Sequence, residues 1–333
     1  MQKKTVDYGV VFMLILLCVG LAGCKSASFA DEKQGAYQVV DYRGTVVEMP
    51  GKPQRIVTLS ACTDGIILGM LPTERLAAIN SLLDDPVSSN IVGKANKIPA
   101  KIRNPSAEQI VALRPDLVIV PDWSGADVVA TLRDIGLKVV VCKGPCNVED
   151  VRETIQLLAK AIDEEEQGSR LLAAMEQKLE EIQGKVRAIP AQERKTVVLI
   201  SLMPSYGGSG CMFDDMCNYA NVVNGIAAAG IQNGQVLSKE QLVAVNPDVL
   251  ILPAYRDHGT YDVESFRRKF LQDPSLQTLK AVRGKRFYVP REGYTYNCSQ
   301  DMVFGIQEVA YAAYGESFAQ PADCHLSVSG ENE

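Results

Sequence analysis

Two segments with one pattern occur in this chain, SAEQIVALRPDLVIVP at residues 106–121 and SKEQLVAVNPDVLILP at residues 238–253. They align without gaps, and nine of sixteen positions are identical. In each copy a serine followed three residues later by glutamine predicts a capped helix start. A Pro-Asp pair then predicts the end of that helix, and the next four apolar residues predict a strand buried on both faces. Two copies of one unit predict two similar α/β lobes.

Strands and helices alternate around the first copy. Residues 37–49 predict a small hairpin with its turn at Arg43-Gly44, and residues 55–60 predict a short apolar strand. The elements predicted further along the first lobe are helices near residues 63–70 and 106–113 and strands near 75–79, 116–120 and 137–141. This order is typical of a parallel sheet.

A long helical stretch lies between the two copies. Apolar residues keep helical spacing from Val151 to Val186, and a helix over residues 164–188 would be roughly 40 Å long at about 1.5 Å per residue. Such a connector braces both lobes and should limit hinge opening. The second lobe then begins with a strand over residues 196–201. The predicted fold is therefore α/β, with two similar lobes of mostly parallel sheet joined by a long rigid α-helix.

The first residues predict export. Lys3 and Lys4 precede an apolar run at residues 10–19, which is a secretory signal pattern and too short to span a bilayer comfortably. The run leads to LAGC at residues 21–24, which resembles a bacterial lipobox. That resemblance implies cleavage before Cys24 and a diacylglycerol on its sulfur, so the protein would be tethered to an envelope membrane on its periplasmic or cell-surface side. An ordinary secreted protein is the alternative.

The predicted domain organisation follows from these segments. It comprises a signal peptide over 1–23, a lipid-anchored tether over 24–36, an N-terminal lobe over 37–147, a helical connector over 148–188, a C-terminal lobe over 189–320 and a tail over 321–333.

Composition excludes several classes of protein. The net charge of −6 is mild and the basic residues are scattered, so the footprint of a nucleic-acid binder is missing. No nucleophile with a base, metal cage or phosphate loop occurs, and residues 207–210, GGSG, lack the lysine of a P-loop. We therefore expect a binding protein without enzymatic activity and without an intrinsic cofactor.

Nine cysteines are many, and seven remain beyond Cys18 and Cys24. The close pairs 142/146 and 211/217 could each close a short loop outside the membrane, but an odd number leaves at least one cysteine unpaired or linked elsewhere. A zinc site built from these pairs is an alternative, although neither their spacing nor the two histidines fit a four-ligand pattern.

Taken in order, these segments resemble the iron-siderophore, haem and vitamin B12 group of periplasmic binding proteins of ABC importers, over nearly all of residues 37–316. The carrying stretches are residues 55–60, both repeat copies, the inter-lobe helix, and 273–276 leading into 279–289. The resemblance implies a monomer that captures an iron chelate, haem or corrinoid and delivers it to a membrane permease. Thr63-Asp64 departs from the Thr-Glu pair more usual in the family, which leaves open any ligand role for that carboxylate.

The resemblance also implies docking residues. In the family one glutamate on each lobe meets arginines of the permease, and the matching positions are Glu108 and Glu240. Both occupy the first turn of a predicted helix, where a negative charge is favourable by itself, so a purely local role is the alternative.

The ligand cleft is expected beyond the carboxyl ends of the strands. Trp123 and Tyr255 occupy equivalent places, each two residues after the strand-ending proline, and two aromatic rings from two lobes would clamp a bulky apolar chelate. Packing within the loops or contact at the rim is the alternative interpretation of these two aromatic residues. Further candidate ligand-binding residues are Arg256, Tyr206, Arg291, Tyr294 and Tyr296. His258 is a weaker candidate as a metal ligand, since a solvated loop histidine is the simpler interpretation.

Other binding classes remain as alternatives. Two-lobed zinc or manganese binding proteins usually present several histidines, and this chain has two. A surface interaction or sensory lipoprotein with the same fold, or a binding protein for a different metal species, would also suit the pattern.

Overall fold

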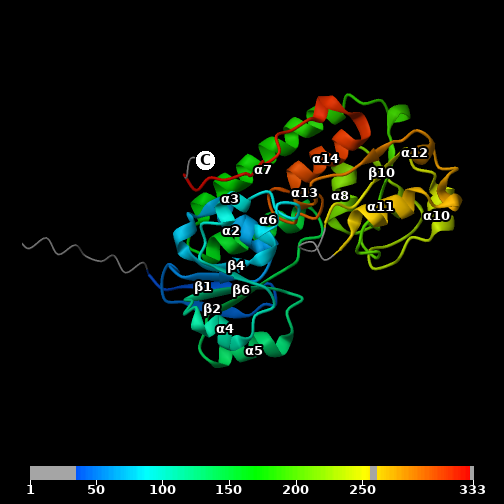
Figure 1. Cartoon of the computed structure of the whole chain (residues 1–333). Coiled ribbons are helices and arrows are strands. Elements are labelled where there is room, and N and C mark those ends of the chain that lie inside the picture. The colour runs from blue at the N-terminus through cyan, green and yellow to red at the C-terminus, as the bar shows by residue number, and fades with distance from the viewer. Residues whose placement is uncertain (1–34, 256–260, 331–333) are drawn as a thin grey trace, which may run out of the picture. The chain divides into compact units, whose positions relative to one another are not determined.

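This computed structural model describes residues 35–255 and 261–330. The fold is built on two parallel sheets, each covered by helices (Figure 1). The α/β class with two lobes is therefore confirmed. The predicted signal peptide and the predicted lipidation site Cys24 lie outside the described residues, as do Arg256 and His258. Across the described ranges no helix is long and apolar enough to cross a membrane.

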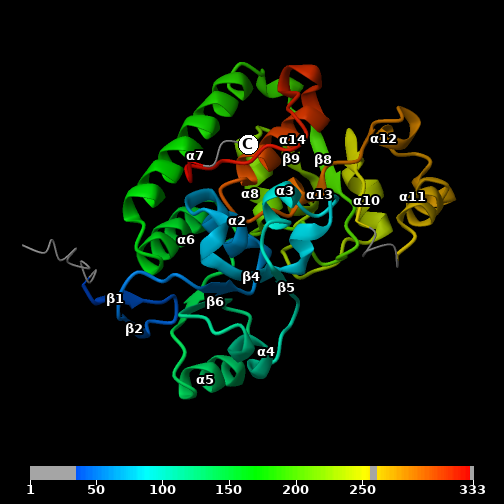
Figure 2. The same cartoon turned by 60° about the vertical axis from the view of Figure 1, so that its left-hand side comes forward.

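The N-terminal lobe is built on a five-stranded parallel sheet in the order β5-β4-β3-β6-β7. Its strands are β3 (Ile56–Thr58), β4 (Leu76–Asn80), β5 (Ala100–Ile102), β6 (Leu117–Pro121) and β7 (Val139–Cys142). The predicted hairpin is confirmed as β1 (Tyr37–Val40) and β2 (Val46–Met49), which pair antiparallel. One face of the sheet is covered by α4 (Ala107–Ala112) and α5 (Ala126–Asp134), and the other by α2 (Ala61–Met70) and α6 (Val148–Ala161) (Figure 2). The short α3 (Val92–Ala95) lies in the loop between β4 and β5.

The C-terminal lobe is built on a four-stranded parallel sheet in the order β11-β10-β8-β9. Its strands are β8 (Thr196–Leu199), β9 (Val223–Asn224), β10 (Val249–Ile251) and β11 (Phe287–Tyr288). Its helices are α8 (Met212–Tyr219), α9 (Gly225–Ala228), α10 (Lys239–Val245), α11 (Val263–Leu271), α12 (Lys280–Arg283), α13 (Glu292–Thr295) and α14 (Met302–Tyr314).

The two repeat copies have the same local structure. Both capping boxes form at the starts of α4 and α10, as predicted. The aspartate of each Pro-Asp pair then fixes a neighbouring strand: the Asp116 carboxylate accepts the backbone N–H of Arg55 at 2.9 Å, and the Asp248 carboxylate accepts that of Thr196 at 2.9 Å. Each copy therefore positions its own strand and the start of the strand beside it.

The long helix α7 (Glu165–Val186, 22 residues) confirms the helix predicted over residues 164–188. It buries an apolar stripe made by Leu171, Met175, Leu179, Ile182 and Val186. This stripe belongs to a single apolar core that also contains Ile56 and Leu117 from the first sheet and Val197 and Val249 from the second. Because one close-packed core runs through both lobes, large hinge opening would expose apolar surface and is disfavoured.

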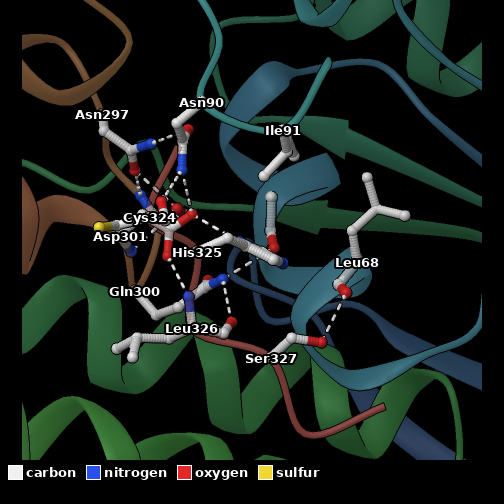
Figure 3. A network of polar contacts seen from close by, with 12 residues as sticks. Leu68, Asn90, Ile91, Asn297, Gln300, Asp301, Cys324, His325, Leu326 and Ser327 are labelled. Carbon is white, nitrogen blue, oxygen red and sulfur yellow. Dashed lines mark hydrogen bonds and ion pairs between the residues drawn. The ribbon is translucent and has the colours of Figure 1, made fainter. Parts of the chain in front are cut away.

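The C-terminal segment returns to the N-terminal lobe (Figure 3). His325 Nδ1 lies 2.7 Å from Asp301 Oδ2, and both side chains are about 1% exposed. The same carboxylate accepts the side-chain amide of Asn90 at 2.7 Å, and the Val328 N–H donates to Gly69 O at 2.7 Å. The segment that the sequence predicts as a tail thus fastens the start of α14 to α2.

All seven cysteines of the described residues carry free thiols, so neither short loop proposed from their spacing is closed here. Over the same residues, no group of three or more histidine, cysteine, aspartate or glutamate side chains is arranged to hold a metal ion. The structure therefore gives no support to the zinc alternative within the described chain.

Candidate ligand cleft

A cavity of about 730 Å³ opens at the carboxyl edge of the five-stranded sheet. Every strand of that sheet is followed by residues that line it: Ser60 after β3, Asn80 at the end of β4, Arg103 after β5, Trp123 after β6 and Cys146 after β7. This is the edge at which open parallel sheets usually hold ligands. The remaining wall comes from residues 292–293 and 296–298, in and after α13.

The cavity continues toward the second sheet. An adjoining pocket of about 320 Å³ is lined by residues 201–203 after β8 and by Tyr255 after β10. The residues that line both spaces are Ala61, Leu82, Ser88, Arg103, Glu292 and Tyr296. Together the two spaces form one cleft that receives residues from the carboxyl ends of both sheets. The structure thus places the predicted residues Trp123, Tyr255 and Tyr296 along this cleft.

Trp123 is presented on the N-terminal side of the cleft and is 66% exposed. Its ring lies directly over Gly144, where a β-carbon would collide with the indole. The turn that carries it is held by the hairpin, because the Arg43 guanidinium donates to the carbonyl oxygens of Asp122 and Ser124 at 2.8 and 3.1 Å. The indole is therefore held at the rim with surface free for a ligand.

Tyr296 forms part of the opposite wall. Its hydroxyl donates to Ser201 Oγ at 2.8 Å, which ties α13 to the end of β8. Its ring packs against Tyr206 with centroids 5.0 Å apart. Tyr206 lies behind Tyr296 and lines a separate pocket of about 120 Å³, so it supports the wall rather than facing the cleft. Burial raises the pKa of both phenols, which keeps them neutral.

Besides Tyr206, two further predicted ligand-binding residues are not brought to the cleft. Arg291 Nη1 lies 2.5 Å from Asp323 Oδ1 in the C-terminal segment, and Tyr294 is fully buried with its hydroxyl donating to a carbonyl there. After the last strand the chain turns into α13, whose helical period puts Glu292 and Tyr296 on the cleft side and Tyr294 in the core.

The structure adds residues that the sequence did not single out. Arg103 and Glu292 both line the cleft, and Glu292 accepts the Ala254 N–H at 2.5 Å while burial raises its pKa. Arg103 directly follows β5, a strand of three residues that is too short to show a pattern. With Asp122 these are the only charged side chains in the described lining of the larger space, so the cleft carries little net charge.

Glu108 and Glu240 are not among the residues that line the cleft, and each is exposed in the first turn of its helix. A hydrogen bond from the Ser106 side chain lowers the pKa of Glu108. The pKa of Glu240 is lowered by its own backbone N–H and then by the Ser238 side chain. Both carboxylates are therefore anionic and available to a partner at equivalent points of the two lobes.

Comparison with known proteins agrees with this architecture. Residues 56–292 match the family described as periplasmic binding protein, and the chain belongs to that family. It is 24% identical to the uncharacterised ABC transporter substrate-binding lipoprotein YvrC of Bacillus subtilis over 96% of this chain and 100% of that one. The chain is thus an ABC transporter substrate-binding protein, and it is not an enzyme.

Two further relatives differ in what they bind. The periplasmic haem-binding protein RhuT of Roseiflexus superposes with a TM-score of 0.68 at 25% identity, covering 81% of this chain and 100% of that chain. The molybdate-binding protein MolA of Haemophilus influenzae, solved with molybdate, superposes with a TM-score of 0.68 at 19% identity, covering 84% and 91%. Family membership therefore fixes the class of protein and leaves the ligand to be argued from the cleft.

Proposed function

We propose that this protein captures a bulky metal chelate, either an iron siderophore, haem or a corrinoid, between its lobes and delivers it to the permease of an ABC importer. The observation that carries the proposal is the cleft itself. It combines about 730 Å³ of space with an adjoining apolar pocket and is bordered by the aromatic rings of Trp123, Tyr255 and Tyr296. Ligand pockets of roughly 300–1,000 Å³ with aromatic walls and few polar groups suit molecules of this size.

The size and charge of the cleft disfavour small ions. A tetrahedral oxyanion has four oxygens, and at about 10–15 Å³ for each water-sized atom it needs on the order of 60 Å³. Arg103 is the single cationic side chain in the described lining, against the carboxylates Asp122 and Glu292. A bare cation would need a cluster of hard or nitrogen ligands, and the described residues contain no such cluster.

The two carboxylates at equivalent positions of the lobes support the proposed delivery of the chelate to a permease. Glu108 and Glu240 project from matching helices, so they can meet matching basic sites on the two halves of a permease. A lipid on Cys24 would hold the protein at the membrane beside that permease. In this proposal the protein works as a tethered monomer, exposed on the periplasmic or cell-surface side.

Binding can be measured through Trp123, since it is the only tryptophan. We would titrate the protein with haem, cobalamin, ferric citrate, a panel of ferric siderophores and molybdate, and follow fluorescence quenching. Sub-micromolar quenching by one chelate class, with none by molybdate, is expected. Tight binding of molybdate instead would refute the bulky-chelate proposal, and no binding by any compound would favour a surface interaction or sensory lipoprotein.

A further inference from the structure

Two cysteines that are distant in sequence meet in the wall of the cleft. Cys62 lies in the first turn of α2, and Cys298 lies in the loop between α13 and α14. The Cys62 thiol donates to the carbonyl oxygen of Cys298 with its sulfur 2.7 Å from that oxygen. Both residues are half-buried and line the cleft, so small molecules can reach them from its open side.

The packing of α2 on this loop holds the two backbones together. The Gln300 side-chain amide donates to Gly65 O at 3.0 Å, and a β-carbon at Gly65 would lie 3.2 Å from Ser299 Cβ. Standard bond lengths place the two cysteine Cα atoms within about 8 Å of each other, given the sulfur contact. A disulfide needs about 4.4–6.8 Å, so a small approach and a rotation of one thiol are sufficient.

The alternative pairing partners are less well placed. Cys146 also lines the cleft, but its thiol donates weakly to Gly144 O at 3.6 Å, and the Cys298 thiol donates to Tyr296 O at 3.7 Å. The remaining cysteines of the described chain do not line this cleft. Among the cleft thiols, only Cys62 contacts the backbone of another cysteine in this structure.

We propose that Cys62 and Cys298 are a dithiol–disulfide pair, whose oxidation by a small disulfide or a disulfide-exchanging protein links α2 of the N-terminal lobe to the α13–α14 loop in the cleft wall. The Cys62 thiolate attacks one sulfur of the donor and releases one thiol, leaving a mixed disulfide. The Cys298 thiolate then attacks the Cys62 sulfur and releases the second thiol. Two cysteine thiols are oxidised, and one donor disulfide is reduced to two thiols.

Burial sets the rate of this exchange. Burial raises the pKa of Cys62 well above its usual value and that of Cys298 to about 12. Because the thiolate is the attacking species, the reaction is slow at neutral pH and accelerates as the pH rises toward these values. The pair should therefore survive as free thiols during brief exposure to an oxidant at neutral pH and close under sustained oxidation.

The consequence for ligand binding rests on the proposed function. In the reduced protein the two sulfurs are available to a bound chelate, including its metal if a coordination position is open. In the oxidised protein the sulfurs are bonded to each other, and α2 is fixed to the loop that carries the Tyr296 wall. Oxidation would then change the groups that a chelate meets without altering the outer rim.

Peptide mapping tests the pair without any ligand. The full chain is reduced, exposed to glutathione disulfide at alkaline pH, alkylated, and digested with trypsin and Asp-N, because Asp301 and Asp323 then separate Cys298 from Cys324. A peptide linking Cys62 to Cys298 is expected as the main internal disulfide. It should vanish in Cys62→Ser and Cys298→Ser and persist in the matched control Cys146→Ser.

A stability measurement supports the map. Oxidation should raise the melting temperature of the wild-type protein by about 5 °C or more, with no such rise in Cys62→Ser. A dominant link between Cys298 and Cys146, or full alkylation of both Cys62 and Cys298 after prolonged oxidation, would overturn the proposal. Neither result bears on quenching of Trp123 by a chelate, so failure of the disulfide and failure of the proposed function are separable.

Discussion

The prediction for Trp123 can be worked out from its exposure. The residue is 66% exposed. Because a tryptophan has a surface of about 200 Å², about 130 Å² of it remains for a ligand to cover. A flat chelate covers one face, or about 65 Å², which at about 25 cal/mol/Å² is worth about 1.6 kcal/mol. Trp123→Ala should therefore weaken binding about 15-fold.

The assay is isothermal titration calorimetry with the chelate that quenches the wild-type protein, because the variant has no tryptophan to report. A second variant keeps the ring: Gly144→Ala should displace the indole from its seat, shift its emission and weaken binding by a similar factor. Gly93→Ala is the matched control, since its added methyl group meets no atom within 4 Å. Unchanged affinity in both Trp123→Ala and Gly144→Ala would refute the clamp.

Three other predictions concern docking, pH dependence and the C-terminal segment. The double variant Glu108→Ala with Glu240→Ala should bind the chelate normally and lose uptake in cells, because both carboxylates lie outside the cleft; normal uptake would refute the docking assignment. Burial raises the pKa of Asp64, whose folded form therefore favours the proton. The stabilising contribution of protonated Asp64 to the free energy of unfolding is full below the usual aspartate pKa and is lost as pH rises through the raised pKa. In urea unfolding, the free energy of unfolding of Asp64→Asn should therefore exceed that of the wild type by more than about 1 kcal/mol at pH 8 and by little at pH 3.5. His325→Ala should lower the free energy of unfolding by at least about 1.5 kcal/mol, since it removes a buried partner of Asp301.

Each of these has a clear contrary result. Equal pH dependence of the wild type and Asp64→Asn would show that the buried carboxyl does not titrate between the folded and unfolded states. For the C-terminal segment, Ser329→Ala is the control at a partly exposed position, and a loss in that variant equal to the loss in His325→Ala would assign the effect to the segment in general.

The sequence predicts the lobes well because their signals are local. The capping box, the Pro-Asp pair and the apolar strand all lie within sixteen residues, and the Asp116 and Asp248 contacts need nothing beyond the adjacent strand. The positions of Trp123 and Tyr255 follow from the same repeat, since each stands just beyond a strand end.

The rest of the cleft depends on contacts that no local pattern encodes. Tyr294 and Tyr296 are equally plausible from sequence, and only the one-turn helix α13 separates the fully buried ring of Tyr294 from the ring of Tyr296 that lines the cleft. Arg103 follows a strand of three residues, too short to predict. The meeting of Cys62 with Cys298 joins positions 236 residues apart, and it depends on how α2 packs against the start of α14.

The most direct test of the central claim is a crystal structure of the protein with the chelate that quenches Trp123. The chelate should lie in the cleft between Trp123 on one side and Tyr255 and Tyr296 on the other. Because one core runs through both lobes, the backbone should move by about 1 Å or less relative to the unliganded protein. A chelate bound elsewhere on the surface, with an empty cleft, would contradict the account.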